Sequence, residues 1–175
     1  KGVGFLYANS RTPLQPFIYG GAQEQGRRAG TENVAGIVGM GKAAEISLTH
    51  LNEYAQTESR LRDYLMHRIL AKIPLTRLNG SHDKRLPGNI NVSFRGIEAA
   101  TLIAMLETKE IYVSGGSACS SADRSPSHVL KALGLTDAMA SGALRITIGH
   151  ENTLSEMEET FQAILSCVRE LRQIG

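Results

Sequence analysis

Between residues 51 and 72, apolar side chains recur at steps of three and four residues, which is the spacing of one face of an α-helix. Pro74 ends the pattern, because proline cannot continue a helix. An amphipathic helix of this length buries its apolar face, so the chain has to fold a partner surface for it. The apolar positions are Leu51, Tyr54, Ala55, Leu61, Leu65, Ile69 and Leu70.

The sequence after Pro74 supplies that surface, because strand and helix patterns follow in the order β-β-α-β-α-β-α. This order predicts an α/β fold with a small sheet packed on one face by helices. Thr153, with Glu156 three residues later, predicts a capping box at the start of the last helix. The expected strands are 75–78, 89–94, 111–113 and 144–148, and the expected helices are 97–107, 127–133 and 154–173.

The first 50 residues follow a different pattern, which suggests the edge of another domain. Short β-type runs at 3–7 and 15–19 precede a glycine-rich, basic loop over 20–31. Thr31 ends this loop and is a good N-cap for a helix expected over about 32–49. The chain opens on Lys-Gly-Val-Gly rather than Met, so we expect it to be a piece of a longer polypeptide.

Composition narrows the classes of partner. With 19 basic and 17 acidic residues the net charge is +2, which argues against nucleic acid as the main partner. No apolar run approaches the ~18–20 residues of a membrane span. Two cysteines are too few for a disulfide framework, so we expect a reducing, cytoplasmic location. Because no CxxC or HxxxH pair occurs, we expect no metal site.

The two cysteines lie in opposite kinds of context. Cys119 lies among Gly, Ser and Ala residues, which provide little packing, and is a candidate reactive thiol. Cys167 lies among apolar residues of the last expected helix and is predicted to be in the core. A cysteine-protease interpretation needs a histidine base, and only His128 is near Cys119 in sequence, so that interpretation is weak.

Two further positions could bind an anion. Arg145 interrupts an apolar strand, so its side chain either faces solvent or holds a carboxylate in a two-pronged contact. Arg27, Arg28 and Thr31 flank a helix start and would suit a phosphate, although a simple N-cap with solvated arginines explains them as well.

Taken together, six motifs in order resemble the C-terminal part of a cysteine desulfurase of the NifS/IscS type. They cover nearly the whole chain, and their order and spacing are far more specific than any one of them. The motifs are Lys-Gly-Val-Gly at 1–4, Gly-Gly-Ala-Gln-Glu-Gln-Gly-Arg-Arg-Ala-Gly-Thr-Glu-Asn at 20–33, Leu-Pro-Gly-Asn-Ile-Asn-Val-Ser-Phe at 86–94, Ser-Ala-Cys-Ser-Ser at 117–121, Pro-Ser-His-Val-Leu at 126–130 and Leu-Arg-Ile-Thr-Ile-Gly at 144–149.

The resemblance implies roles for three of these residues. Cys119 matches the nucleophile that takes sulfur from L-cysteine as a persulfide and leaves L-alanine. Arg145 matches the arginine that holds the substrate carboxylate. Thr31 matches a threonine that reaches the cofactor phosphate of the neighbouring subunit. His128 falls on a motif position to which we assign no role.

The resemblance also implies an architecture, that of a homodimeric, fold-type-I pyridoxal 5'-phosphate enzyme. Residues 1–50 would close the large cofactor domain, and residues 51–175 would form most of the small α/β domain with its small, mainly antiparallel sheet. The Schiff-base lysine of the family lies just before this segment, and Lys1 is not that residue. The chain alone should therefore be inactive and should need the upstream part of the same polypeptide.

Two alternatives stay open beside the desulfurase interpretation. Selenocysteine lyase shares most of these motifs, and the composition of the Cys119 loop favours desulfurase over it. The other alternative is a non-catalytic fragment that docks a sulfur acceptor or an iron–sulfur scaffold protein. We expect such an acceptor as partner of the active enzyme too, and its identity is not written in the sequence.

Overall fold

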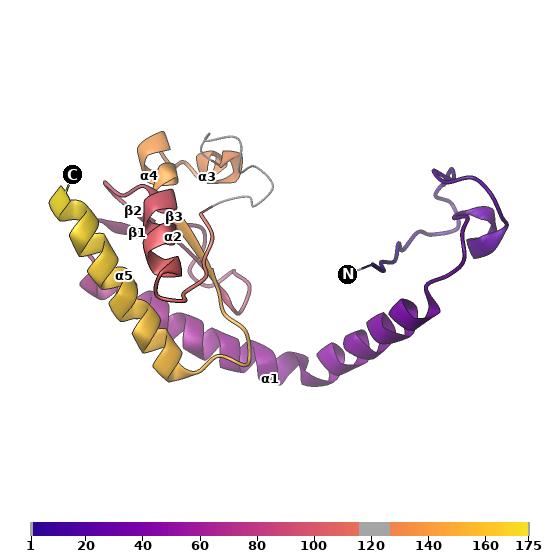
Figure 1. Ribbon diagram of the computed structural model, residues 1–175, viewed down its shortest axis with the longest axis horizontal. Coiled ribbons are helices and arrows are strands. Elements are labelled where there is room, and N and C mark those ends of the chain that lie inside the picture. Colours follow the sequence, from indigo (N-terminus) through magenta and orange to yellow (C-terminus); the bar gives the residue numbers. More distant parts are fainter. Residues whose placement is uncertain (1, 116–126, 175) are drawn as a thin grey trace. The chain divides into compact units, whose positions relative to one another are not determined.

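The computed structural model describes residues 2–115 and 127–174, and Cys119 lies outside them. The chain divides into two compact units, Lys1–Leu51 and Asn52–Gly175. In chain order the elements are η1 Gln23–Gly26, α1 Val34–Lys72, β1 Thr76–Leu78, β2 Asn89–Phe94, α2 Ala99–Glu107, α3 His128–Ala132, α4 Asp137–Ser141, β3 Ala143–Thr147 and α5 Leu154–Ile174 (Figure 1).

The sheet of the second unit is antiparallel throughout, in the order β1-β2-β3, which confirms the small antiparallel sheet expected from the resemblance. The strand expected at 111–113 does not form. Glu110 turns the backbone through the left-handed region with a φ of 59°, and the segment meets β3 only through an isolated bridge at Ser114. A strand needs several consecutive residues paired with a neighbouring strand, and here Ser114 alone is paired, with Arg145.

One hydrophobic core joins the sheet to the helices. Figure 1 shows α2 and α5 close to each other, and their buried faces belong to the same core as one face of the sheet. Each fully buried aliphatic or aromatic side chain stabilises the fold by roughly 1.5–3 kcal/mol. The core draws Leu61, Leu65 and Ile69 from α1, Ile90, Val92 and Phe94 from β2, Leu102 and Leu106 from α2, Leu144 and Ile146 from β3, and Phe161, Ile164 and Val168 from α5.

The predicted capping box is present at the start of α5. The backbone N–H of Thr153 donates to Oε2 of Glu156 at 2.6 Å, and the backbone N–H of Glu156 donates to Oγ1 of Thr153 at 3.3 Å. The Thr153 N–H bond is also the main reason why the pKa of Glu156 is lowered. Two orphan donors of the helix end are satisfied by this exchange.

The two helices expected over about 32–49 and 51–72 are a single helix, α1. No glycine or proline occurs between residues 42 and 73, so nothing in the backbone breaks the helix there. The expected N-cap is also wrong. The side chain of Asn33, and not that of Thr31, accepts the backbone N–H of Gly36 at 3.1 Å.

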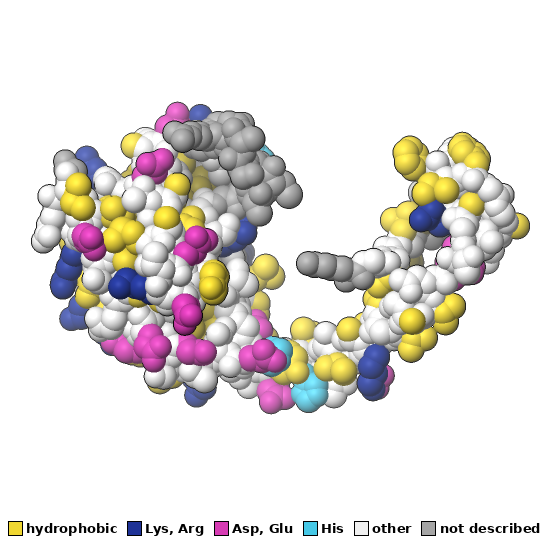
Figure 2. Space-filling view, in the orientation of Figure 1, with side chains coloured by type: hydrophobic (Ala, Val, Ile, Leu, Met, Phe, Trp, Pro, Cys, Tyr) yellow, Lys and Arg dark blue, Asp and Glu magenta, His cyan; other side chains and the backbone are white. Residues whose placement is uncertain are grey.

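The first unit buries almost nothing of its own. Among its described residues only Ala29 is buried, and the β-type runs expected at 3–7 and 15–19 form no strand. Figure 2 shows hydrophobic side chains spread over the outside of this unit. Its exposed large apolar residues are Phe5, Leu6, Tyr7, Leu14, Phe17, Ile18, Tyr19, Val34, Ile37, Val38, Ile46, Leu48 and Leu51.

Candidate functional site

The second face of the sheet is polar, because β2 alternates along its length. Ile90, Val92 and Phe94 enter the core, so Asn89, Asn91 and Ser93 lie on the opposite face. A polar face of this kind usually meets solvent. Here Ser93 is completely buried instead, which marks this face as an organised polar surface.

Arg145 lies on this polar face, in the middle of β3. Its neighbours in the strand, Leu144 and Ile146, point into the core. Its cross-strand partner on β2 is Asn91, and Ser114 flanks it on the other side. The side chain is half-buried, and no described side chain gives the guanidinium a hydrogen bond or an ion pair. A half-buried cation without an internal acceptor is suited to bind an external anion.

The segment that leads to Cys119 is fixed to β3 at its beginning. The N–H of Ser114 donates to the carbonyl of Arg145 at 3.0 Å, and the N–H of Arg145 donates to the carbonyl of Ser114 at 2.6 Å. Gly115 then passes close to α2, since a Cβ there would lie 3.1 Å from Cδ1 of Ile103 and 3.3 Å from Cβ of Ala99. The sheet and α2 therefore set the position from which the Cys119 segment leaves.

The side chains of Asn79, Asn91 and Ser93 form a hydrogen-bonded cluster beside Arg145 on the same face of the sheet. Asn79 follows β1, and its backbone N–H donates to the carbonyl of Asn91 at 2.8 Å. Its Nδ2 donates to Oδ1 of Asn91 at 2.7 Å and to Oγ of Ser93 at 2.8 Å. Asn79 is only 4% exposed, so these bonds replace water that the amide has lost.

Thr31 belongs to the other unit. It follows Gly30, which has a φ of 105° and whose N–H donates to Oε1 of Gln23 at 3.2 Å. Thr31 is exposed, and its hydroxyl makes no hydrogen bond to a described residue. Since Asn33 caps the helix, the Thr31 hydroxyl is not needed for capping.

The second cysteine is in the core, as predicted. Cys167 is 1% exposed, and burial raises the pKa of its thiol. A buried thiol with a raised pKa is a poor nucleophile. His128 begins α3, and nothing in the described residues gives it a chemical role.

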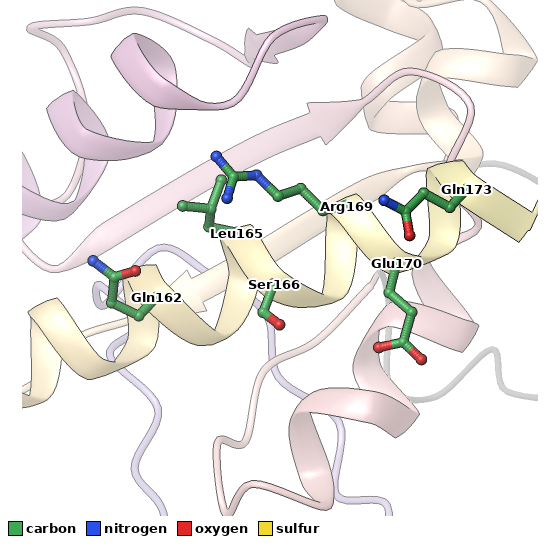
Figure 3. Close-up of a pocket in the computed structure, with 6 residues that line it drawn as sticks. All are labelled: Gln162, Leu165, Ser166, Arg169, Glu170 and Gln173. Carbon is green, nitrogen blue, oxygen red and sulfur yellow. The ribbon is translucent and has the colours of Figure 1, made fainter.

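The surface hollows of the described residues do not add a second site. One lies along α5 and is lined by residues of that helix alone, which Figure 3 labels. It includes neither Arg145 nor Ser114. In residues 2–115 and 127–174 no three His, Cys, Asp or Glu side chains gather as metal ligands would. No helix in the same ranges is both long and apolar enough to cross a bilayer.

Comparison with known proteins places these features in a family. Residues 1–159 match the family described as aminotransferase class-V. The chain belongs to this family. As a member of the aminotransferase class-V family, it is 44% identical over all of its 175 residues to the cysteine desulfurase IscS of Methanosarcina thermophila, covering 43% of that protein. It is 43% identical to the cysteine desulfurase IscS of Clostridium botulinum, covering 45% of it. The chain thus spans less than half the length of these curated relatives.

Solved structures of NifS-like proteins resemble the chain as well. A NifS-like protein superposes on 93% of the chain with a TM-score of 0.81 and 33% identity, and the match covers 41% of that protein. A NifS-like protein from Rickettsia africae superposes on 89% of the chain with a TM-score of 0.78 and 28% identity, covering 40% of it. The α/β fold expected from the resemblance, with its small antiparallel sheet, is therefore confirmed.

Sequence reasoning missed one part of this candidate site, the pair of amides of Asn79 and Asn91. The alternation over 89–94 does place Asn91 on the polar face. It does not say that Asn79 lies next to Asn91, because that depends on the register between β1 and β2.

Proposed function

We propose that the natural polypeptide containing these residues is a cysteine desulfurase that uses pyridoxal 5'-phosphate. It converts L-cysteine to L-alanine and leaves the sulfur as a persulfide on Cys119. The observation that carries the proposal is the pair of backbone hydrogen bonds between Ser114 and Arg145. This pair ties the beginning of the Cys119 segment to Arg145, a strand residue suited to bind a substrate carboxylate.

Arg145 holds the carboxylate of L-cysteine. Its planar guanidinium donates two parallel N–H bonds to the two carboxylate oxygens, which fixes the orientation of the amino acid as well as its position. The absence of an acceptor for Arg145 among the described side chains supports this role. An arginine already paired with an internal carboxylate would have to break that pair before each turnover.

Cys119 is the acceptor of the sulfur. Its thiolate attacks Sγ of the substrate, so that a sulfur–sulfur bond forms while the Cβ–Sγ bond of the substrate breaks. The electron pair of the broken bond goes to the substrate carbon, which takes a proton and becomes the methyl group of alanine. No external oxidant is needed, because the sulfur is oxidised as the carbon is reduced. Cys167 cannot replace Cys119, since its thiol is buried in the core.

Pyridoxal 5'-phosphate, when bound, supplies the electron sink that makes this carbon–sulfur cleavage possible. Thr31 fits a phosphate contact, because its hydroxyl is exposed and bonded to no described residue. The resemblance assigns this contact to the cofactor of the neighbouring subunit in a homodimer. The resemblance implies a Schiff-base lysine upstream of these residues, so residues 1–175 alone should be inactive.

Residues 1–50 are proposed to be the edge of a large cofactor domain, and residues 51–175 most of a small domain. The support comes from the first unit, which exposes Phe5, Tyr7, Phe17 and Tyr19 by 80% or more and buries only Ala29 among its described residues. Such a surface needs a partner, and the rest of a longer polypeptide is the partner that the comparisons favour. The second subunit of a homodimer would cover the rest of this exposed apolar surface.

For the persulfide, we propose delivery to a sulfur-acceptor protein in the cytoplasm, with iron–sulfur scaffold proteins as the expected class. The family resemblance supports this proposal. The acceptor would have to reach Cys119, so its contact surface is expected around residues 114–128.

The decisive experiment uses the natural polypeptide that carries these residues, purified with its cofactor. We expect one alanine per cysteine consumed, and a mass increase of one sulfur atom on a peptide that contains Cys119. Cys119→Ser should abolish both while cofactor absorbance is retained. Cys167→Ala is the matched control and should keep activity. Turnover without a persulfide on Cys119 would contradict the assigned role.

The same preparation separates the alternatives. Turnover of L-selenocysteine with none of L-cysteine would establish the lyase instead. A polypeptide that turns over neither amino acid but binds a scaffold protein would establish the docking fragment.

A further inference from the structure

We propose that Asn91, oriented by Asn79, is a positioning residue that keeps Arg145 available for the substrate carboxylate. It does so by presenting an amide N–H₂ group, and not an oxygen, on the side of Arg145. This inference rests on the proposed function, and concerns which atom lies next to the guanidinium.

The first step is the register of the strands. Asn91 lies between Asn79 on one side and Arg145 on the other, on the same face of the sheet. The backbone of Asn91 is hydrogen-bonded to Asn79, and the backbone of Arg145 is hydrogen-bonded to Ser114. Asn91 and Arg145 therefore form a non-hydrogen-bonded pair, the type in which facing side chains come closest.

The second step is the orientation of the Asn91 amide. Its Oδ1 accepts from Nδ2 of Asn79 at 2.7 Å, so its oxygen is turned towards β1. The oxygen and nitrogen of a carboxamide lie on opposite edges of one plane, so Nδ2 of Asn91 is turned to the other side, where β3 carries Arg145. Two groups of donors then face each other, and neither neutralises the other.

The third step asks whether the Asn79 amide could be reversed. In the observed orientation its two N–H groups have two acceptors, Oδ1 of Asn91 and Oγ of Ser93, and only Oδ1 of Asn79 is left without a partner among the described residues. In the reversed orientation both buried N–H groups would lose their acceptors. One orphan acceptor costs less than two orphan donors, because a carbonyl oxygen tolerates missing bonds better.

The test replaces only the N–H₂ group of the Asn91 side chain. Asn91→Asp replaces the amide N–H₂ by an oxygen of nearly the same size, while the other carboxylate oxygen still accepts from Asn79. The fold is thereby retained, and Arg145 gains an internal carboxylate. In the cofactor-loaded natural polypeptide we expect KM for L-cysteine to rise about tenfold or more, with kcat within about threefold of the parent.

Two companion variants make the test specific. Asn91→Ala removes the amide without adding a negative oxygen beside Arg145, so KM should rise less than in Asn91→Asp. Asn89→Asp adds the same charge on the same strand face, opposite Thr147 and not opposite Arg145, and should raise KM much less than Asn91→Asp. An Asn91→Ala variant with the KM of Asn91→Asp, or an Asn91→Asp variant with unchanged KM, would overturn the inference.

A crystal structure of the Asn91→Asp polypeptide provides a readout that does not depend on turnover. We expect a carboxylate oxygen of residue 91 within 4 Å of the Arg145 guanidinium. Lack of turnover in the parent would refute the proposed function, while this ion pair would still support the placement of Asn91. A parent that is active together with a variant that shows no ion pair would refute the inference alone.

Discussion

Ser114 and Arg145 exchange both of their backbone hydrogen bonds, at 3.0 and 2.6 Å, although 30 residues lie between them in the sequence. Through this bridge the segment that leads to Cys119 begins beside the residue suited to bind a carboxylate. Because these are backbone bonds, most substitutions of the Arg145 side chain leave the bridge in place. The carboxylate-binding role of the Arg145 side chain can therefore be tested separately from the role of its backbone in holding Ser114.

Removing the Arg145 side chain should weaken substrate binding without unfolding the protein. For Arg145→Ala we expect a loss of about 2–5 kcal/mol, or roughly 30-fold or more in kcat/KM for L-cysteine. Arg145→Lys should fall between this variant and the parent, because it keeps the charge and loses the two-pronged geometry. Steady-state kinetics of the cofactor-loaded polypeptide measure both. Arg77→Ala, exposed on the same face of the sheet, is the control and should change little.

The capping box of α5 should be visible in stability. Thr153→Ala removes the hydroxyl that accepts the N–H of Glu156, and a lost N-cap costs about 1 kcal/mol. We expect the urea midpoint to fall with an unchanged m-value. Ser155→Ala lies in the same helical turn and should shift stability by less than about 0.5 kcal/mol. Equal effects of the two variants would mean that the cap is unimportant.

The contact between α1 and α5 should depend on pH. The hydroxyl of Tyr64 donates to Glu158 at 2.6 Å, and this bond, followed by the one from Gln162, lowers the pKa of Glu158 below its ordinary value of 4.5. A group with a lowered pKa contributes its stability above the unfolded pKa and loses it as the pH falls through the folded pKa. Glu158→Gln should therefore lower Tm at pH 7, and the difference from the parent should shrink below pH 4.5.

Glu159→Gln is the control for this pH effect. It removes the same charge from the next position of α5 without touching Tyr64 or Arg68, which donates to Glu158 at 2.8 Å. A pH-dependent Tm difference of the same size in Glu159→Gln would mean that net charge, and not the contact of Glu158, is responsible. Thermal unfolding between pH 3 and pH 7 distinguishes the two explanations.

Gly88 should tolerate no side chain. Its carbonyl accepts the N–H of Ile148 at 2.8 Å, and a Cβ on Gly88 would collide with the carbonyl oxygen of Ile148. Neither backbone can move without breaking the end of β3, so Gly88→Ala should cost about 1–3 kcal/mol in unfolding free energy. At Gly149 a Cβ would meet only Oδ1 of Asn152, at 3.9 Å, so Gly149→Ala should be nearly neutral. Urea unfolding of both variants measures the difference.

Cys167 should resist alkylation in the folded protein. Its thiol is 1% exposed and its pKa is raised by burial, so little thiolate forms and reagents cannot reach it. Iodoacetamide at pH 8 should label Cys167 only after denaturant is added, as peptide mass spectrometry would show. Labelling of Cys167 in the native protein at the rate of a free thiol would contradict its place in the core.

Local patterns predicted the second unit well, because each of its signals acts over a few residues. The alternation over 89–94 gave β2 with its bounds, and Thr153 with Glu156 gave the start of α5. The prediction failed where partners were missing. Residues 111–113 have strand propensity, yet the segment meets β3 only at the next residue, Ser114. The helix α4, of five residues, was too short to be noticed.

The candidate site was predictable only in part. Arg145 was singled out because a charge in an apolar strand is unusual, and Cys119 because small residues surround it. That Thr31 does not cap α1 could not be known beforehand, since Asn33, two residues later, is an equally good cap.

The sequence by itself determined the order of helices and strands after Pro74, the apolar face of each, and the residue types able to take a sulfur and hold a carboxylate. Only the tertiary structure decided that Asn79, Asn91, Arg145 and Ser114 form one row on the polar face of the sheet. The reason is physical. Side-chain alternation along a strand is a local property, whereas the neighbours across strands depend on register. A shift of one strand by one residue would turn that strand's side chains to the other face and break the row.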